Sequence, residues 1–179
     1  MTDSTDLIDS RVAWRRLIAA LALSTIGGVG MWSVVVALPA VQAEFGVTRA
    51  AASFPYTLTM LGFGIGGIFM GRLSDRYGVR VPLIGATFAL ALGYCIASMS
   101  SSLLMFAIVQ GLLIGMLGSS ASFAPLLADT SHWFLRRRGL AVSIVASGNY
   151  LAGALWPPIV QALIENVGWR SAHLTIGAI

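Results

Sequence analysis

The residues best placed to do chemistry lie in one short charged segment, residues 71–80 (GRLSDRYGVR). In it one aspartate, Asp75, stands among three arginines: Arg72, Arg76 and Arg80. A carboxylate close to several arginines can form a bidentate ion pair with a guanidinium group. Alternatively, it can face the N-terminus of a helix, where negative charge is favoured. Gly78 allows a sharp turn that a Cβ would hinder. The segment therefore predicts a compact polar turn whose ion pairs can form and break.

Elsewhere the sequence offers little for catalysis. It contains no serine–histidine–acid set, no paired-carboxylate site and no metal-spaced cluster, so no catalytic residue and no metal site is predicted. The single cysteine, Cys95, excludes an internal disulfide. We expect the chain not to be an enzyme and to need no cofactor.

Long stretches without Asp, Glu, Lys or Arg flank the charged segment, at 17–43, 50–71, 81–128 and 139–164. A helix needs about 20 apolar residues to cross roughly 30 Å of hydrocarbon. The longest stretch, of 48 residues, is therefore interpreted as two spans joined by a turn at residues 99–102. The expected spans are 17–40, 50–71, 81–99, 103–128 and 139–164, with a sixth beginning at 171.

Composition agrees with an all-α bundle of transmembrane helices. Hydrophobic residues make up 57 % of the chain and charged residues 10 %. A soluble helical core is the alternative, but soluble helices keep a polar face. We expect residues 1–13 to form a disordered cytosolic tail and 14–179 to form the transmembrane domain, with membrane lipid as a partner and no nucleic acid.

The distribution of arginine predicts the orientation. If the spans alternate, nine arginines fall on one side of the membrane and only Arg49 and Arg170 on the other. Short loops rich in arginine stay cytoplasmic. The N-terminus, the 72–80 turn and the 129–138 loop are therefore expected inside. The absence of lysine suggests a bacterial source, and hence the inner membrane.

The end of the sequence suggests that a second half is missing. A sixth span starting at 171 has only nine residues before Ile179, which is about half a bilayer at 1.5 Å per residue. The pattern acidic-x-x-Gly-x-Arg also occurs twice, at 75–80 and 165–170. One copy is expected inside and the other outside, as in the inverted three-helix repeats of secondary transporters.

The charged segment resembles the hallmark loop of the major facilitator superfamily, G-x-L-[AS]-D-R-x-G-x-[RK]. The matching positions are Gly71, Leu73, Ser74, Asp75, Arg76, Gly78 and Arg80. The resemblance implies that the chain is the amino-terminal six-helix half of a twelve-helix transporter. It also implies a gating role for Gly71, Leu73, Asp75, Arg76, Gly78 and Arg80, in which the loop holds the two halves together in one state. The alternative is that the arginines only set topology.

A second stretch, residues 132–141 (HWFLRRRGLA), is similar to the monocarboxylate and oxalate/formate branch of that superfamily. The drug–proton antiporters of the superfamily carry an arginine three residues before a Gln-Gly pair. Here Gln110-Gly111 is preceded at that position by Ala107, which weakens a drug-antiporter interpretation.

In this superfamily the first and fourth helices line the substrate cavity. The resemblance therefore implies Trp32, Ser33 and Gln110 as the first candidates for substrate contact, with Asn149 and Tyr150 as second choices. An interhelical hydrogen bond is the alternative role for each of them. A stripe of small residues is expected to serve helix packing instead: Gly111, Gly115, Gly118 and Ser122.

The predicted function is a secondary active carrier that works by alternating access on a small organic anion such as a monocarboxylate. Export of a drug-like or neutral solute is the alternative within the superfamily. A non-transporting membrane scaffold or receptor is the alternative outside it. The coupling ion is left open, with a proton as one candidate.

Overall fold

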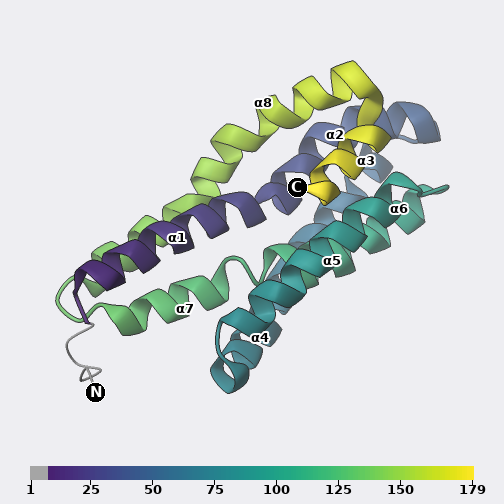
Figure 1. Cartoon of the computed structure of the whole chain (residues 1–179). Coiled ribbons are helices and arrows are strands. Elements are labelled where there is room, and N and C mark those ends of the chain that lie inside the picture. Colours follow the sequence, from purple (N-terminus) through teal and green to yellow (C-terminus); the bar gives the residue numbers. More distant parts are fainter. Residues whose placement is uncertain (1–7) are drawn as a thin grey trace.

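The computed structural model describes residues 8–179, and all of its regular elements in that range are helical. Five segments are long and apolar enough to cross a membrane: Arg11–Phe45, Arg49–Tyr77, Arg80–Ser98, Leu103–Trp133 and Arg138–Ala178. They run up and down along one bundle (Figure 1). The all-α transmembrane architecture predicted from the sequence is thereby confirmed.

The first segment consists of two helices, α1 (Arg11–Gly27) and α2 (Val29–Phe45), which meet at Gly28. A Cβ on Gly28 would come within 2.5 Å of the Ala152 side chain, so the junction allows close approach of α8. Helix α1 begins earlier than the predicted end of the tail at residue 13, because the Ser10 side chain accepts hydrogen bonds from two backbone N–H groups of the first turn. Residues 1–7 of the predicted tail lie outside the described residues.

The second segment contains the short helix α3 (Arg49–Ala52) and the long helix α4 (Phe54–Tyr77). The charged segment is therefore not the compact turn expected from its composition. Its residues 71–77 continue α4, and only Gly78 and Val79 separate α4 from α5 (Arg80–Ser98). The reason is that no residue before Gly78 breaks the helix, and a glycine such as Gly71 is tolerated inside one.

The fourth segment is formed by α6 (Leu103–Val109), the π-helix η2 (Gln110–Ser119) and α7 (Ala124–Trp133). The connection from α5 is short, and the Ser102 side chain accepts from the N–H of Met105 to begin α6. A π-helix of this length is uncommon, since such turns occur mainly as single bulges, often at functional sites. Here it begins at Gln110, one of the residues implicated by the sequence.

The last element, α8 (Arg138–Ala178), bends sharply at Gly168, where φ is 79° and ψ is 158°. Its first part, 138–167, is the fifth crossing, and its last part, 169–178, turns back into the bundle (Figure 1). Gly78 has nearly the same backbone conformation, with φ 80° and ψ 160°. The two copies of the acidic-x-x-Gly-x-Arg pattern therefore make the same sharp turn at opposite ends of the bundle.

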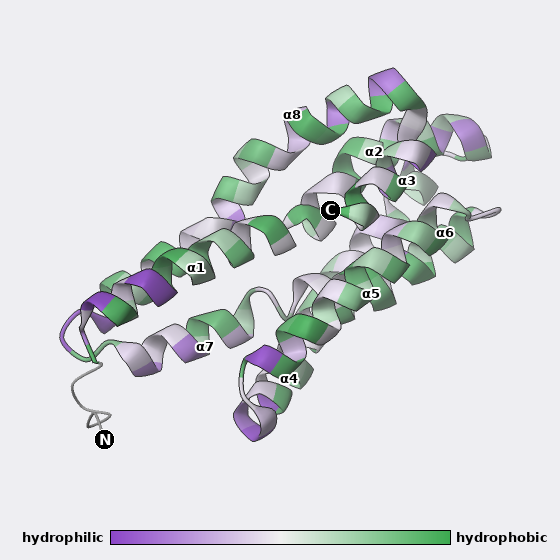
Figure 2. Ribbon diagram, viewed as in Figure 1, coloured by the Kyte–Doolittle hydropathy of each residue, from purple (hydrophilic) through white to green (hydrophobic). Residues whose placement is uncertain are grey.

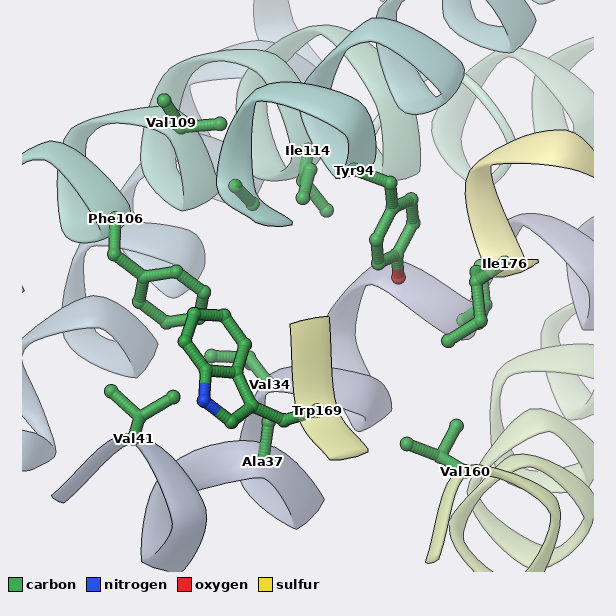
Figure 3. Close-up of a cluster of buried hydrophobic side chains, with 12 residues drawn as sticks. Val34, Ala37, Val41, Tyr94, Phe106, Val109, Ile114, Val160, Trp169 and Ile176 are labelled. Carbon is green, nitrogen blue, oxygen red and sulfur yellow. The ribbon is translucent and has the colours of Figure 1, made fainter. Parts of the chain in front are cut away.

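Close packing of the helices depends on small residues and on one large apolar cluster. A Cβ on Gly62 or Gly66 of α4 would collide with backbone oxygens of η2. The main cluster joins α2, α5, α6, η2 and α8 through Val34, Tyr94, Phe106, Ile114 and Trp169, among others (Figure 3).

Hydrophobic residues dominate the middle of the helices, and the most hydrophilic residues gather at the ends of the bundle (Figure 2). Large hydrophobic side chains also face outward, among them Ile18, Ile65, Phe69, Ile84 and Phe88. Such exposure is costly in water but suits contact with lipid chains.

Candidate functional site

A buried polar cluster lies among α2, α5, η2 and the last part of α8. Its members are Ser33, Tyr94, Gln110 and His173, and each side chain is at most 1 % exposed. The hydroxyl oxygens of Ser33 and Tyr94 are 2.6 Å apart, which is a hydrogen bond. The Tyr94 ring contacts the imidazole of His173 edge to face, with ring centroids 5.4 Å apart. Four elements thus contribute polar groups to the interior of an otherwise apolar bundle.

Gln110 and His173 face each other across this cluster. Gln110 Nε2 lies 3.5 Å from His173 Nε2, and the other ring nitrogen, Nδ1, lies 2.9 Å from the carbonyl oxygen of Trp169. Gln110 Oε1 is buried and has no hydrogen-bond partner among the described residues. A buried amide oxygen without a partner is unfavourable by about 1–3 kcal/mol, so this atom requires an explanation.

Trp32 and Asn149 meet at a second place, between α2 and α8. Trp32 Nε1 donates to the carbonyl oxygen of Asn149 at 3.2 Å, and the indole covers Gly153 so closely that a Cβ there would lie 2.7 Å from Cζ2. Both residues are half-buried, whereas the neighbouring Tyr150 is 77 % exposed. Tyr150 is therefore presented on the surface of the bundle.

The five predicted cavity residues thus do not converge on one pocket within this chain. Ser33 and Gln110 belong to the buried polar cluster, Trp32 and Asn149 to the α2–α8 contact, and Tyr150 to the surface. Sequence reasoning missed His173, which lies beyond the five complete spans, and Tyr94, which lies within the third span but was not among the polar candidates. The usable signal was the spacing of Trp169 and His173, which places them on one face of a helix that begins right after Gly168.

A cavity of about 260 Å³ opens beside the cluster, between α1, α5 and α8. Tyr94 lines one wall, Trp156 and Ile176 line another, and most of the remaining lining is aliphatic, from residues such as Leu23 and Leu90. Its volume and lining suit a small ligand with a substantial apolar part.

The hallmark segment lies at the end of the bundle that carries Gly78. Asp75, Arg76, Gly78 and Arg80 are exposed, and Gly71 and Leu73 are half-buried. Within residues 8–179, Asp75 makes no ion pair, so the expected pairing with its neighbouring arginines is absent. Residues 71–77 continue α4 and Arg80 begins α5, so the segment does not form the turn in which these charges were expected to gather. Added Cβ atoms at Gly71 and Gly78 would contact nothing within 4 Å, so this surface is open.

The opposite end of the bundle, which carries Gly168, holds an ion pair between Arg170 and Glu44 that is supported by further hydrogen bonds. Arg170 donates to Glu44 Oε1 through Nε at 2.9 Å and Nη2 at 2.7 Å, and to the carbonyl oxygens of Ser98 and Ser100 at 2.5 and 2.7 Å. The Trp169 indole N–H donates to the other oxygen of Glu44. Arginine thereby connects α8 both to α2 and to the last carbonyl groups of α5 and its following loop, an arrangement that the sequence did not predict.

The predicted packing stripe contacts several neighbours instead of one. Added Cβ atoms at Gly111 and Gly115 would meet Leu58 and Thr59 of α4, whereas one at Gly118 would meet Leu90 of α5. Ser122 faces Gly27 of α1. The π-helix explains the difference, because its wider turn rotates successive residues away from the positions they would hold on an α-helix.

The two copies of the acidic-x-x-Gly-x-Arg pattern occupy corresponding turns, after the second and after the fifth crossing, as in the inverted repeats typical of secondary transporters. The chain belongs to the Major Facilitator Superfamily, whose family model matches residues 19–179. The resemblance seen in the residues of the charged segment is confirmed by this match.

Curated relatives include two monocarboxylate transporters. The chain is 41 % identical over 108 residues to monocarboxylate transporter 11 of Homo sapiens, which covers 60 % of this chain and 22 % of that protein. It is 28 % identical over 180 residues to monocarboxylate transporter 6 of Mus musculus, an alignment that covers 100 % of this chain and 38 % of that protein. The fujikurins efflux protein of Gibberella fujikuroi is 36 % identical over 113 residues, covering 63 % of the chain and 24 % of that protein. The chain therefore spans well under half the length of these relatives.

Proposed function

We propose that this chain forms the amino-terminal half of a secondary active carrier that moves a small organic anion, such as a monocarboxylate, by alternating access. The observation that carries the proposal is the pair of matched glycine turns, Gly78 and Gly168, in a chain of the Major Facilitator Superfamily. Inverted repeats of this kind allow one bundle to rock against another about a central site. The similarity to two monocarboxylate transporters supports the substrate class.

The proposed orientation places the Gly78 end in the cytoplasm, together with the N-terminus. Three arginine-containing parts of the chain gather near that end: the start of α1, the α4–α5 turn and the loop before α8 (Figure 1). Excess arginine in short loops favours the cytoplasmic side. In a bacterial cell this membrane would be the inner membrane.

The gating role of Asp75 and Arg76 is proposed for their contact with a second six-helix half. Both side chains are exposed at the end of α4, and Asp75 has no ion-pair partner within the described chain. A charged pair that forms between halves in one state and separates in the other would bias the equilibrium between those states. The missing partner would come from the second half.

Substrate contact is proposed for Trp32, Asn149 and Tyr150. Ser33 and Gln110 are buried and would influence substrate binding only indirectly, through the buried polar cluster. Trp32 offers an aromatic face and Tyr150 an exposed hydroxyl group. No ionisable side chain other than His173, Tyr94 and Cys95 lies deep in the described part of the bundle. The cationic partner of an anionic substrate would therefore belong to the second half.

The proposal is tested with the full-length carrier in proteoliposomes, by measuring uptake of radiolabelled lactate and pyruvate. The wild type is expected to catalyse uptake and exchange of at least one of them. Asp75→Asn is expected to lower the rate about tenfold or more at equal protein content, whereas Glu165→Gln, the same loss of charge at the exposed acidic position of the other pattern copy, keeps the rate. Unimpaired transport by Asp75→Asn would remove the gating role.

Efflux of an apolar or drug-like solute is the second candidate, and the cavity beside Tyr94 favours it specifically, because its lining is mostly aliphatic. The similarity to a fujikurins efflux protein points the same way. Transport of each solute class decides between the two: under this alternative, the carrier moves amphipathic solutes and does not move carboxylates. A wild type that moves neither class of solute would favour a non-transporting scaffold.

A further inference from the structure

We propose that His173 is a proton-binding site of the carrier, with Nε2 as the atom that takes the proton and Gln110 as the group that receives the new N–H. This inference deepens the proposed transport function, since it names a coupling ion and its residue. Proton binding can, however, be measured without any substrate. The argument uses the contacts of His173 with Trp169, Gln110, Tyr94 and Phe106.

The hydrogen bond to the backbone determines which ring nitrogen is available. A carbonyl oxygen can only accept, so His173 Nδ1, at 2.9 Å from Trp169 O, must carry hydrogen. In the neutral ring Nε2 then has a free lone pair. The Gln110 amide nitrogen, at 3.5 Å from Nε2, is a donor and faces that lone pair. The described arrangement is therefore that of a neutral imidazole with Nε2 as acceptor.

The unpartnered oxygen of Gln110 can accept the hydrogen bond that a protonated His173 ring would donate. Oε1 is buried without a hydrogen-bond partner on the same amide group whose nitrogen faces Nε2. Rotation of the terminal amide by half a turn exchanges the two atoms and presents Oε1 to Nε2. A proton that arrives from water and binds Nε2 makes an imidazolium whose two N–H groups then donate to Trp169 O and Gln110 Oε1. Gln110 Oε1, which has no partner in the neutral state, thereby gains a charge-assisted hydrogen bond in the charged state.

Aromatic rings complete the surroundings of the imidazole. The ring centroids of Tyr94, Trp169 and Phe106 lie 5.4, 5.5 and 5.7 Å from that of His173. All three are within the distance at which a cation is attracted by an aromatic ring, about 6 Å. Figure 3 shows Phe106 and Trp169 side by side, with the Tyr94 hydroxyl pointing into the same interior. An imidazolium whose N–H edge met the face of one of these rings would be partly compensated for the loss of water.

The helices that pack around His173 each contribute ionisable groups near it. Helix α5 contributes Tyr94, whose hydroxyl pairs with Ser33 of α2, and the half-buried Cys95. Helix α2 contributes Glu44 and α8 contributes Arg170, which pair with each other one turn away from His173. Trp169 connects the two places, because its carbonyl accepts from His173 and its indole N–H donates to Glu44. His173 is thus linked through Trp169 to the ion pair between Glu44 and Arg170 at the Gly168 end.

Complete burial suits a coupling site. His173 is 0 % exposed, so a proton bound there cannot exchange with water on either side in this conformation. Coupling requires that a bound proton be released to one side at a time, and an occluded site meets that condition. Proton exchange then accompanies movement of the last part of α8 about Gly168.

The direct test is a titration of the wild-type full-length carrier, labelled with ¹⁵N-histidine, in lipid nanodiscs. His173→Gln and His132→Gln identify the two resonances, and His132, which is exposed, serves as the internal reference. As the pH is lowered from about 8 to about 4, the His173 signal is expected to begin to change from that of a ring with hydrogen on Nδ1 only to that of a doubly protonated ring. If His173 stays neutral throughout, the proton site is excluded.

A second variant tests the partner. Gln110→Met keeps the length of the side chain but removes the acceptor oxygen. We expect it to shift the His173 midpoint downward by about one pH unit, roughly a tenfold loss of proton affinity. An unchanged midpoint would exclude Gln110 as the receiving group.

Transport assays distinguish a role of His173 in proton coupling from a merely structural role. His173→Gln is expected to lose accumulation of substrate driven by a pH gradient but to retain substrate exchange, because exchange moves no net protons. A structural defect would lower both, and His132→Gln should lower neither. If the wild type transports no organic anion, the proposed function fails, while the histidine titration still decides the proton site on its own.

Discussion

The two ends of the bundle share a backbone turn but differ in what their charges do. At the Gly78 end, Asp75 and Arg76 are exposed, and Asp75 has no ion-pair partner within the described chain. At the Gly168 end, Arg170 is fully engaged with Glu44 and with carbonyl groups of the α5–α6 connection. The repeated sequence pattern therefore determines the turn, whereas the use of the charges depends on what packs nearby. One end has its charges paired within the described chain, and the other leaves its charges exposed.

The largest effect is expected from replacing either glycine of the matched turns. Gly78→Ala and Gly168→Ala each force an L-residue into φ near 80° and ψ near 160°, a region essentially restricted to glycine, and should lower the free energy of unfolding by about 2 kcal/mol. Thermal unfolding of the purified carrier in detergent measures this. Both sites have open space for a Cβ, so the penalty is conformational and should be similar at the two ends. A clear difference between them would break the equivalence of the turns.

A smaller effect, and one confined to one end, is expected for the arginines. Arg170→Gln removes the ion pair with Glu44 and the hydrogen bonds to Ser98 and Ser100, and should lower the free energy of unfolding by about 1 kcal/mol, since the site is partly exposed. The matched change Arg76→Gln should alter it by less than about 0.5 kcal/mol. The same unfolding assay compares the two. Equal losses at both ends would mean that Arg76 has a structural partner within this half.

A small effect of opposite sign is expected at Gly71. Gly71→Ala places a methyl group in open space on a helix, where alanine is favoured over glycine by up to about 1 kcal/mol. The melting temperature of the isolated half should therefore stay equal or rise slightly. In the full-length carrier, a marked loss of stability with this variant would indicate that the second half packs against Gly71.

The sequence predicted the architecture well because lipid excludes charge. Stretches without charged residues locate the crossings, and arginine-rich segments locate their ends. The limits of the helices were harder to predict, since they depend on local capping. Ser10 extends α1 beyond the expected tail, and the helix at 71–77 continues until Gly78. Charge marks where a helix leaves the membrane, but caps and glycines mark where it ends.

The candidate site was predicted less completely. Gln110 and Ser33 were identified as polar residues inside spans, but whether they face a cavity or a neighbouring helix depends on tertiary packing, and the structure buries both. His173 was missed because it lies beyond the last complete span. The π-helix also has no evident sequence signal, although it decides which neighbours Gly111 and Gly118 contact.

Alternating access is tested most directly by the chemical accessibility of the two ends. In a cysteine-free background of the full-length carrier, Arg76→Cys and Ser101→Cys place thiols at exposed positions of opposite ends. A membrane-impermeant maleimide should label Arg76→Cys only from the cytoplasmic side and Ser101→Cys only from outside, and a transported substrate should shift the two labelling rates in opposite directions. Labelling of both thiols from the same side, or rates that no transported substrate changes, would contradict the account.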